Sequence, residues 1–138
     1  MPLVAGLEAL FGGAMGFGGP ATLLSMVVLV GGYALSTYAL MENRFFSGTV
    51  RIQTERGHHV ISGGPYGWMR HPGYAGGLLA YLATPVLLGS RWACLPMVVL
   101  FALLLLRTAL EDRTLQEELP GYREYAQRVR YRLLPGVW

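Results

Sequence analysis

The sequence contains no lysine and a single cysteine, and only 14% of its 138 residues are charged. An ordinary soluble domain carries roughly 25% charged residues, so this composition disfavours a soluble fold. Hydrophobic residues make up 53% of the chain and the formal net charge is only +3, which argues against disorder and against nucleic-acid binding. The lone Cys94 excludes an intramolecular disulfide. The length favours one domain over residues 1–138.

The N-terminal part of the chain is uncharged from the residue after Glu8 to the residue before Glu42. As one helix this segment would be about 50 Å long, whereas the hydrocarbon core of a bilayer is about 30 Å thick. Proline is favoured in the first turn of a helix, so Pro20 divides the segment and predicts a membrane span over residues 20–42. Residues 1–19 are rich in glycine and lack the basic start of a signal peptide, so we expect a half-span or the remnant of a hairpin.

Two more hydrophobic segments, residues 72–90 and 92–106, lie further along the chain with only Arg91 between them, and the helical pattern of the second continues past Arg107 to Leu119. This short connection predicts an antiparallel helical hairpin over residues 72–119. A proline within the first helix removes one internal hydrogen bond and is expected to kink it at Pro85. The second helix is expected to end at Pro120-Gly121. The predicted fold is therefore all-α, a polytopic membrane helical bundle.

The arginines orient this bundle. Four of the eleven lie within the connector at residues 43–71 and six lie between residues 107 and 138, while Arg91 alone occupies the tip of the hairpin. Because basic residues accumulate on the cytoplasmic side of membrane proteins, we expect the connector and the tail to face the cytoplasm. We expect a bacterial-type inner membrane.

The tail, residues 120–138, has apolar residues at helical spacing with arginines on the other sides. This pattern is typical of a basic amphipathic helix lying at the lipid headgroups. The same apolar stripe could instead pack on the cytoplasmic ends of the spans, and the sequence does not separate the two interpretations. The stripe consists of Tyr122, Tyr125, Ala126, Val129 and Leu133.

Two polar groups could form a site. Arg70 and His71 directly precede Pro72, so a guanidinium, an imidazole and the free N–H groups of a helix N-terminus gather where an anion is favoured. Contact with lipid phosphate and capping of the helix are the simpler roles for this pair. Arg107 and Glu111 lie four residues apart on the last span, as a surface ion pair or as groups facing a cavity. The antiparallel hairpin predicts that His71 and Glu111 are neighbours.

Other kinds of site find no support in the sequence. The adjacent His58 and His59, the distant His71 and the single Cys94 at the far end of the hairpin give no compact set of four ligands, so we expect no metal. A Gly-x-Ser-x-Gly nucleophile elbow and the glycine-rich fingerprints of phosphate and dinucleotide sites are also absent.

Several separated motifs resemble those of the isoprenylcysteine carboxyl methyltransferase and phospholipid methyltransferase group of integral membrane enzymes. The resemblance covers about residues 42 to 138. The residues that carry it are His58-x-Val60-Ile61-x-x-Gly64-x-Tyr66-x-x-x-Arg70-His71-Pro72-x-Tyr74-x-Gly76, then Arg107-x-x-x-Glu111-Asp112-x-x-Leu115, then Gly121-Tyr122-Arg123-Glu124-Tyr125.

The resemblance implies a methyltransferase that uses S-adenosyl-L-methionine, held in a cytoplasmic pocket between the last two spans and the C-terminal segment. By motif, the implied cofactor-binding positions are His58, Tyr66, His71, Pro72, Tyr74, Gly76 and Glu111, and the implied polar positions at the catalytic edge are Arg70 and Arg107, with Glu111 in both sets. Asp112 stands where relatives often have a second glutamate, and either carboxylate suits the ammonium or ribose hydroxyls of the cofactor.

The expected acceptor is a membrane lipid or a lipidated small molecule, such as an isoprenylcysteine carboxylate or a phospholipid amine. A carboxylate arrives ionised and needs only positioning, whereas an amine must lose a proton, for which Glu111 or a neutral His71 could be the base. Relatives usually carry additional N-terminal helices. A non-catalytic or partner-dependent subunit, completed by partner helices or a second copy, is therefore the alternative.

Overall fold

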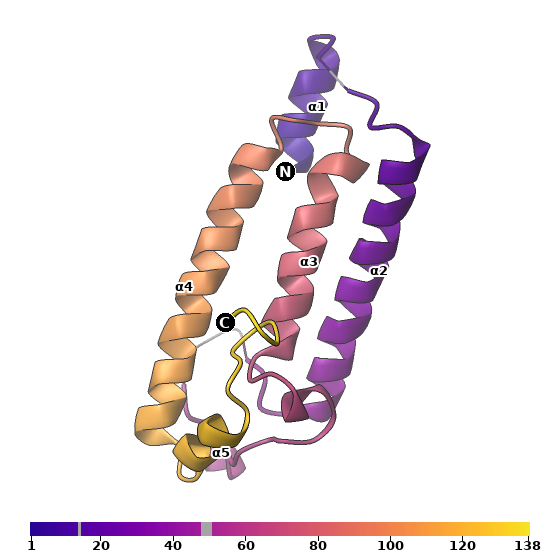
Figure 1. Ribbon diagram of the computed structural model, residues 1–138. Coiled ribbons are helices and arrows are strands. Elements are labelled where there is room, and N and C mark those ends of the chain that lie inside the picture. The colour runs from indigo at the N-terminus through magenta and orange to yellow at the C-terminus, as the bar shows by residue number, and fades with distance from the viewer. Residues whose placement is uncertain (14, 48–50) are drawn as a thin grey trace.

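The computed structural model describes residues 1–13, 15–47 and 51–138, and within these ranges every regular element is a helix. Figure 1 shows the long helices α2, α3 and α4 side by side, with α3 between the other two. The all-α prediction is confirmed. The elements are α1 (Pro2–Leu10), α2 (Gly19–Glu42), the 3-10 turns η1 (Thr54–Arg56) and η2 (Gly64–Gly67), α3 (Pro72–Leu87), α4 (Cys94–Glu118) and α5 (Tyr122–Arg128).

The prolines start the helices where the sequence predicted. Pro20 and Pro72 lie in the first turns of α2 and α3, where the missing proline N–H has no helical partner to lose. Pro85 stays within α3, so this helix continues through the position at which a kink was expected. The turn between α3 and α4 includes Gly89 at φ +60°, a left-handed conformation that glycine adopts without a steric penalty. The predicted antiparallel hairpin is thus present.

Helices α2 and α3 approach each other closely because small residues face each other at the crossing. A Cβ atom on Gly76 would lie within 3.0 Å of the Gly32 carbonyl oxygen and of Ser36 Oγ. The Ser36 hydroxyl donates a hydrogen bond of 2.8 Å to the Gly73 carbonyl across the same interface. Gly76 is therefore a packing residue of the α2–α3 interface.

We expect Gly76→Ala to lower the free energy of unfolding by about 1–3 kcal/mol, because overpacking at a backbone contact forces the helices apart. The neighbouring Gly77→Ala is the matched control, since its added Cβ would only touch Leu104 at 3.6 Å. Alanine is the better helix former, so this control should be neutral or more stable by up to about 1 kcal/mol. Denaturation of both variants in detergent measures the difference, and equal effects would contradict the packing role.

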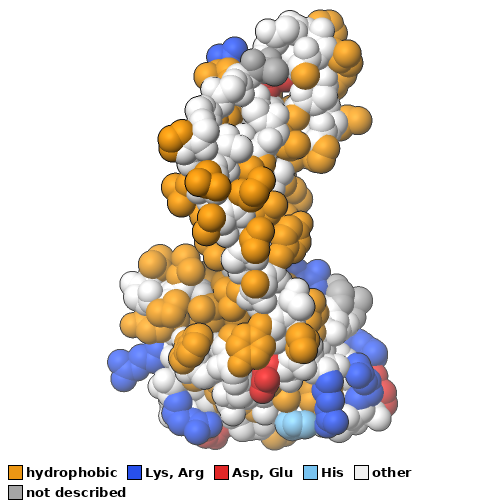
Figure 2. Space-filling model, turned by 90° about the vertical axis from the view of Figure 1, so that its right-hand side faces the viewer, with side chains coloured by type: hydrophobic (Ala, Val, Ile, Leu, Met, Phe, Trp, Pro, Cys, Tyr) orange, Lys and Arg blue, Asp and Glu red, His pale blue; other side chains and the backbone are white. Residues whose placement is uncertain are grey.

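Two of the described helices, α2 and α4, are long and apolar enough to cross a membrane, whereas α3 has 16 residues. Their most apolar windows are only 11% and 6% buried within the chain, unlike the core helix of a soluble protein. Figure 2 shows hydrophobic side chains around the middle of the molecule, with most charged side chains at one end. The protein is therefore a membrane protein.

The tail packs on the bundle instead of presenting its apolar stripe outward. Tyr122, Tyr125 and Leu133 are almost completely buried, which favours the second of the two interpretations of the stripe. The amphipathic helix is also shorter than the pattern suggests, because α5 ends at Arg128 and the following residues run back toward the start of α3.

Candidate functional site

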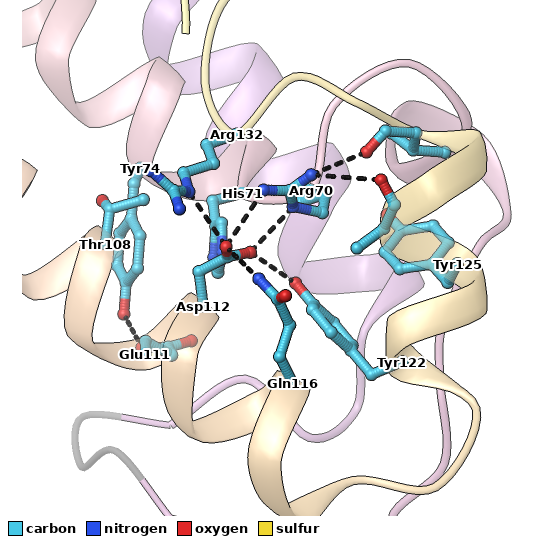
Figure 3. A network of polar contacts seen from close by, with 12 residues as sticks. Arg70, His71, Tyr74, Thr108, Glu111, Asp112, Gln116, Tyr122, Tyr125 and Arg132 are labelled. Atoms are coloured by element: carbon cyan, nitrogen blue, oxygen red, sulfur yellow. Dashed lines mark hydrogen bonds and ion pairs between the residues drawn. The ribbon is translucent and has the colours of Figure 1, made fainter.

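A buried carboxylate organises the end of the bundle that carries the arginines. The Asp112 side chain, on α4, has no exposed surface and accepts two parallel hydrogen bonds from Arg70, Nε at 2.7 Å and Nη2 at 3.0 Å. This bidentate geometry is the strongest that arginine offers a carboxylate. Figure 3 shows the donors converging on Asp112 from three parts of the chain. The other donors are His71 Nε2 at 3.2 Å, the Tyr122 hydroxyl at 3.1 Å, Gln116 Nε2 at 2.8 Å and Arg132 Nε at 2.9 Å.

Arg70 also binds the tail. Its Nη1 donates to the carbonyls of Val129 and Arg130 at 2.9 and 3.0 Å, so all three guanidinium nitrogens are bound within the protein. The backbone N–H groups of Arg70 and His71 donate to the carbonyls of Tyr131 and Arg132 at 2.9 and 2.8 Å. The tail is thereby fixed across the N-terminus of α3.

Beside this network lies a recess of about 720 Å³, counting its open mouth. Its walls come from the connector, the N-terminus of α3, the end of α4, and α5. Six of the predicted site residues lie in the wall, together with aromatic and aliphatic groups from the connector and the tail. The predicted residues in the wall are His58, Tyr66, Arg70, His71, Tyr74 and Glu111.

Glu111 and Tyr74 form the polar side of the recess. The Tyr74 hydroxyl donates to Glu111 Oε2 at 2.6 Å and accepts from Arg107 Nε at 2.9 Å. The Arg107 guanidinium also lies 5.6 Å from the centre of the Tyr74 ring, and its Nη2 donates to the Ser47 carbonyl at 3.3 Å. The predicted proximity of His71 and Glu111 is confirmed, because both line this recess.

The connector covers the recess through an aromatic cluster. The His58 ring stacks on Phe45 with centroids 4.5 Å apart, and the guanidinium of Arg44 lies 4.9 Å from the same phenyl ring. Gln53 is buried and anchors the segment, since its Nε2 donates to the Phe45 carbonyl at 2.6 Å. The Gln53 backbone N–H donates to His58 Nδ1 at 3.3 Å, which requires an unprotonated Nδ1.

The pKa of His58 is lowered from its ordinary value of 6.5 by burial and by the nearby His59 and Arg56. Below pH 6.5 the unfolded chain gains a proton that the folded chain does not, so the stability due to neutral His58 is lost as the pH falls through the folded pKa. We expect the thermal stability in detergent to fall between pH 7 and pH 5, and to fall less in His58→Gln, which accepts the bond without titrating. An identical pH dependence in both proteins would contradict this.

Tyr66 joins the connector to α2 and α5. Its hydroxyl accepts from Asn43 Nδ2 at 3.2 Å, and its carbonyl accepts from the Tyr125 hydroxyl at 2.7 Å. Burial raises the pKa of Tyr66 to about 12. The phenol is therefore neutral at physiological pH and remains a hydrogen-bond donor.

The structure places four of the predicted residues outside the wall of the recess. Pro72 starts α3, Gly76 faces α2, Arg107 lies behind Tyr74, and Asp112 lies beneath Arg70. The residues at the start of the connector that line the recess were not predicted from the sequence, although the consecutive aromatics Phe45 and Phe46 were the available signal. The wall residues that were missed include Asn43, Phe45 and Phe46 of the connector and Leu119 after α4, while Val60, Tyr122 and Tyr125 appeared only as motif or stripe residues.

Comparison with known proteins decides the family. The model of the isoprenylcysteine carboxyl methyltransferase family matches residues 23–117, most of the chain. The chain belongs to this family. The match includes the isoprenylcysteine carboxyl methyltransferase motifs on the connector, α3 and α4 but ends before α5.

Similar proteins include named isoprenylcysteine methyltransferases and also a protein with a different name, a sterol reductase. A probable protein-S-isoprenylcysteine O-methyltransferase of Oryza sativa is 32% identical over 111 residues, covering 75% of this chain and 56% of the relative. Protein-S-isoprenylcysteine O-methyltransferase B of Arabidopsis thaliana is 32% identical over 108 residues, with 77% and 54% covered. The Delta(14)-sterol reductase TM7SF2 of Mus musculus is 32% identical over 129 residues, with 86% and 31% covered. The chain therefore spans about half the length of the plant methyltransferases.

Proposed function

We propose that this protein transfers a methyl group from S-adenosyl-L-methionine to the carboxylate of an isoprenylcysteine or a similar lipidated acceptor. The observation that carries the proposal is the recess beside the N-terminus of α3, in which Glu111 and Tyr74 of the family motifs share a hydrogen bond. The names of the plant relatives support the choice of acceptor.

The chemistry of the wall residues fits this cofactor. Glu111 can accept from the ammonium or the ribose hydroxyls, and the positive end of the α3 helix dipole favours the carboxylate. Tyr66, Tyr74 and Phe45 offer rings against which the adenine can pack, and a ring face attracts a sulfonium. When bound, S-adenosyl-L-methionine supplies an electrophilic methyl group. The protein's task is then to bind and aim two reactants, for which effective molarities reach roughly 10⁵ to 10⁸ M.

The network assigns different tasks to the polar residues. Arg70 and Asp112 bind each other and the tail, so we assign them positioning roles in place of direct contact with substrate or cofactor. Arg107 orients Tyr74 and Tyr74 orients Glu111, which leaves Glu111 as the charged residue that contacts the cofactor. An ionised carboxylate acceptor needs no base. A phospholipid amine would need one, and Glu111 or His71 would then be required to remove a proton.

We further propose that the recess faces the cytoplasm, in a bacterial-type inner membrane. Ten of the eleven arginines lie in the connector, at the end of α4 or in the tail, whereas Arg91 lies at the other end. The prenyl chain of the acceptor would remain in the bilayer against the exposed apolar surface of α2 and α4 and bring only its polar end to the recess.

The test is methyl transfer by purified protein in lipid nanodiscs, using cofactor with a labelled methyl group. One reaction contains a prenylated cysteine analogue and another contains a total lipid extract. Label in the prenylcysteine ester supports the proposal, and label only in phospholipid shifts the acceptor to an amine. Saturable cofactor binding without turnover, together with a stoichiometric helical partner on purification, would support the partner-dependent alternative.

A further inference from the structure

A second recess lies at the opposite end of the bundle from the methyl-transfer recess. Figure 1 shows α1 beside the turn between α3 and α4, at the end away from α5. The recess is an open groove of about 900 Å³, including the solvent at its open side, and its wall is apolar apart from one carboxylate. The residues that line it are Val4, Leu7, Glu8, Phe11, Gly13, Trp92, Leu95 and Pro96.

The carboxylate of Glu8 is buried in an unusual way. Only 3% of its side chain is exposed, and Oε2 accepts hydrogen bonds from the Ser90 hydroxyl and, at 3.3 Å, from the Trp92 backbone N–H. The other oxygen, Oε1, accepts no hydrogen bond from the described residues. A buried acceptor without a donor is unfavourable, so Oε1 favours a ligand that brings an N–H or O–H group.

A cation lies beside this carboxylate but faces the solvent. Arg91 Nε lies 3.5 Å from Glu8 Oε1, yet 63% of the Arg91 side chain is exposed. Trp92 is half-exposed at the same end, as expected for a residue at the membrane interface. The apolar wall of the recess therefore contains a buried negative charge, and an exposed positive charge lies next to that carboxylate.

We propose that this recess binds a zwitterionic phospholipid with a primary ammonium, of the phosphatidylethanolamine class. The ammonium would donate to Glu8, the phosphate would accept from Arg91, and one acyl chain would lie against Leu7, Leu95 and Phe11. A choline headgroup has no N–H to donate, and a glycerol headgroup has no cation to pair with the carboxylate. This lipid is bound away from the methyl-transfer recess, and the inference does not depend on the proposed function.

Fluorescence of Trp92 can measure this binding, because Trp92 lines the recess and the chain has only three tryptophans. In the Trp68→Phe, Trp138→Phe background, Trp92 is the sole fluorophore. Nanodiscs of one neutral host lipid receive equal fractions of phosphatidylethanolamine, phosphatidylcholine or phosphatidylglycerol, each brominated on the acyl chains near the headgroup. We expect quenching by the ethanolamine lipid at roughly three- to tenfold lower mole fraction, as charge-assisted hydrogen bonds predict.

Glu8→Gln keeps the acceptors for Ser90 and Trp92 but removes the charge, so it should abolish the preference for the ethanolamine lipid. The matched control is Glu118→Gln, an exposed glutamate at the other end, which should leave the preference unchanged. Should Glu8→Gln fail to fold, Arg91→Gln tests the phosphate contact, which the three lipids share, and should raise the mole fraction of the ethanolamine lipid needed for quenching; an unchanged mole fraction would contradict that contact. Equal quenching by all three lipids in the unaltered recess, or stronger quenching by the glycerol lipid, would overturn the proposal.

Discussion

Asp112→Asn is expected to lower the free energy of unfolding by about 3–5 kcal/mol, the usual cost of removing one partner from a buried ion pair. Asparagine has nearly the same shape but no charge, and its amide cannot accept both of the parallel bonds from Arg70. The guanidinium of Arg70 would remain buried without a counter-charge, and Arg132 would lose its anchor in α4.

The measurement is denaturation in detergent with circular dichroism, together with limited proteolysis of the tail. The tail should become more susceptible to cleavage, because its carbonyls are fixed by the same Arg70 that Asp112 holds. Glu117→Gln is the matched control, since Glu117 lies on the same helix in an exposed ion pair with Arg113, which solvent screens. Equal stability of the Asp112 and Glu117 variants would contradict the central role of Asp112.

Glu111→Gln is expected to leave the protein folded and to reduce methyl transfer by about 100-fold or more, because it removes a charge from the recess where a cationic ligand is proposed to bind. The stability should change little, since glutamine still accepts the hydrogen bond from the Tyr74 hydroxyl. Most of the loss should be in cofactor affinity, measured by isothermal titration of the purified protein with cofactor.

Tyr74→Phe tests the orientation of the Glu111 carboxylate without removing its charge. Phenylalanine keeps the ring in the recess but removes the hydroxyl between Arg107 and Glu111, so we expect a smaller loss of activity than for Glu111→Gln. Glu118→Gln controls for the loss of one negative charge at the same end of the bundle. Unchanged cofactor affinity in Glu111→Gln would remove Glu111 from the cofactor site, whatever the acceptor proves to be.

Much of the architecture was predictable from the sequence because hydrophobic length and proline position act locally. Pro20 and Pro72 fixed the starts of α2 and α3, and Pro120 with Gly121 ended α4. The short turn after α3 made the hairpin antiparallel, which predicted that His71 and Glu111 share one end of the bundle. Periodicity was less informative for the tail, because a buried stripe and a membrane-facing stripe have the same spacing.

The tasks of individual site residues were not predictable in this way. Gly76 belongs to a family motif, but its motif position does not reveal that its missing side chain allows α2 to approach α3. Asp112 and Glu111 are adjacent carboxylates of similar chemistry. Their roles differ because adjacent residues of α4 point in different directions. Glu111 lines the recess, whereas Asp112 is buried among its hydrogen-bond donors.

The sequence by itself determined the helical class, the order of the hydrophobic segments, the charged end of the bundle and the motifs that carry the family resemblance. These features depend on the residues of each segment alone and not on contacts with other segments. Only the tertiary structure decided that Arg70 holds the tail, that the connector covers the recess and that Glu8 of α1 lies buried against the turn between α3 and α4. Such contacts join residues far apart in the chain, and they depend on helix rotation and side-chain packing that residue spacing does not specify.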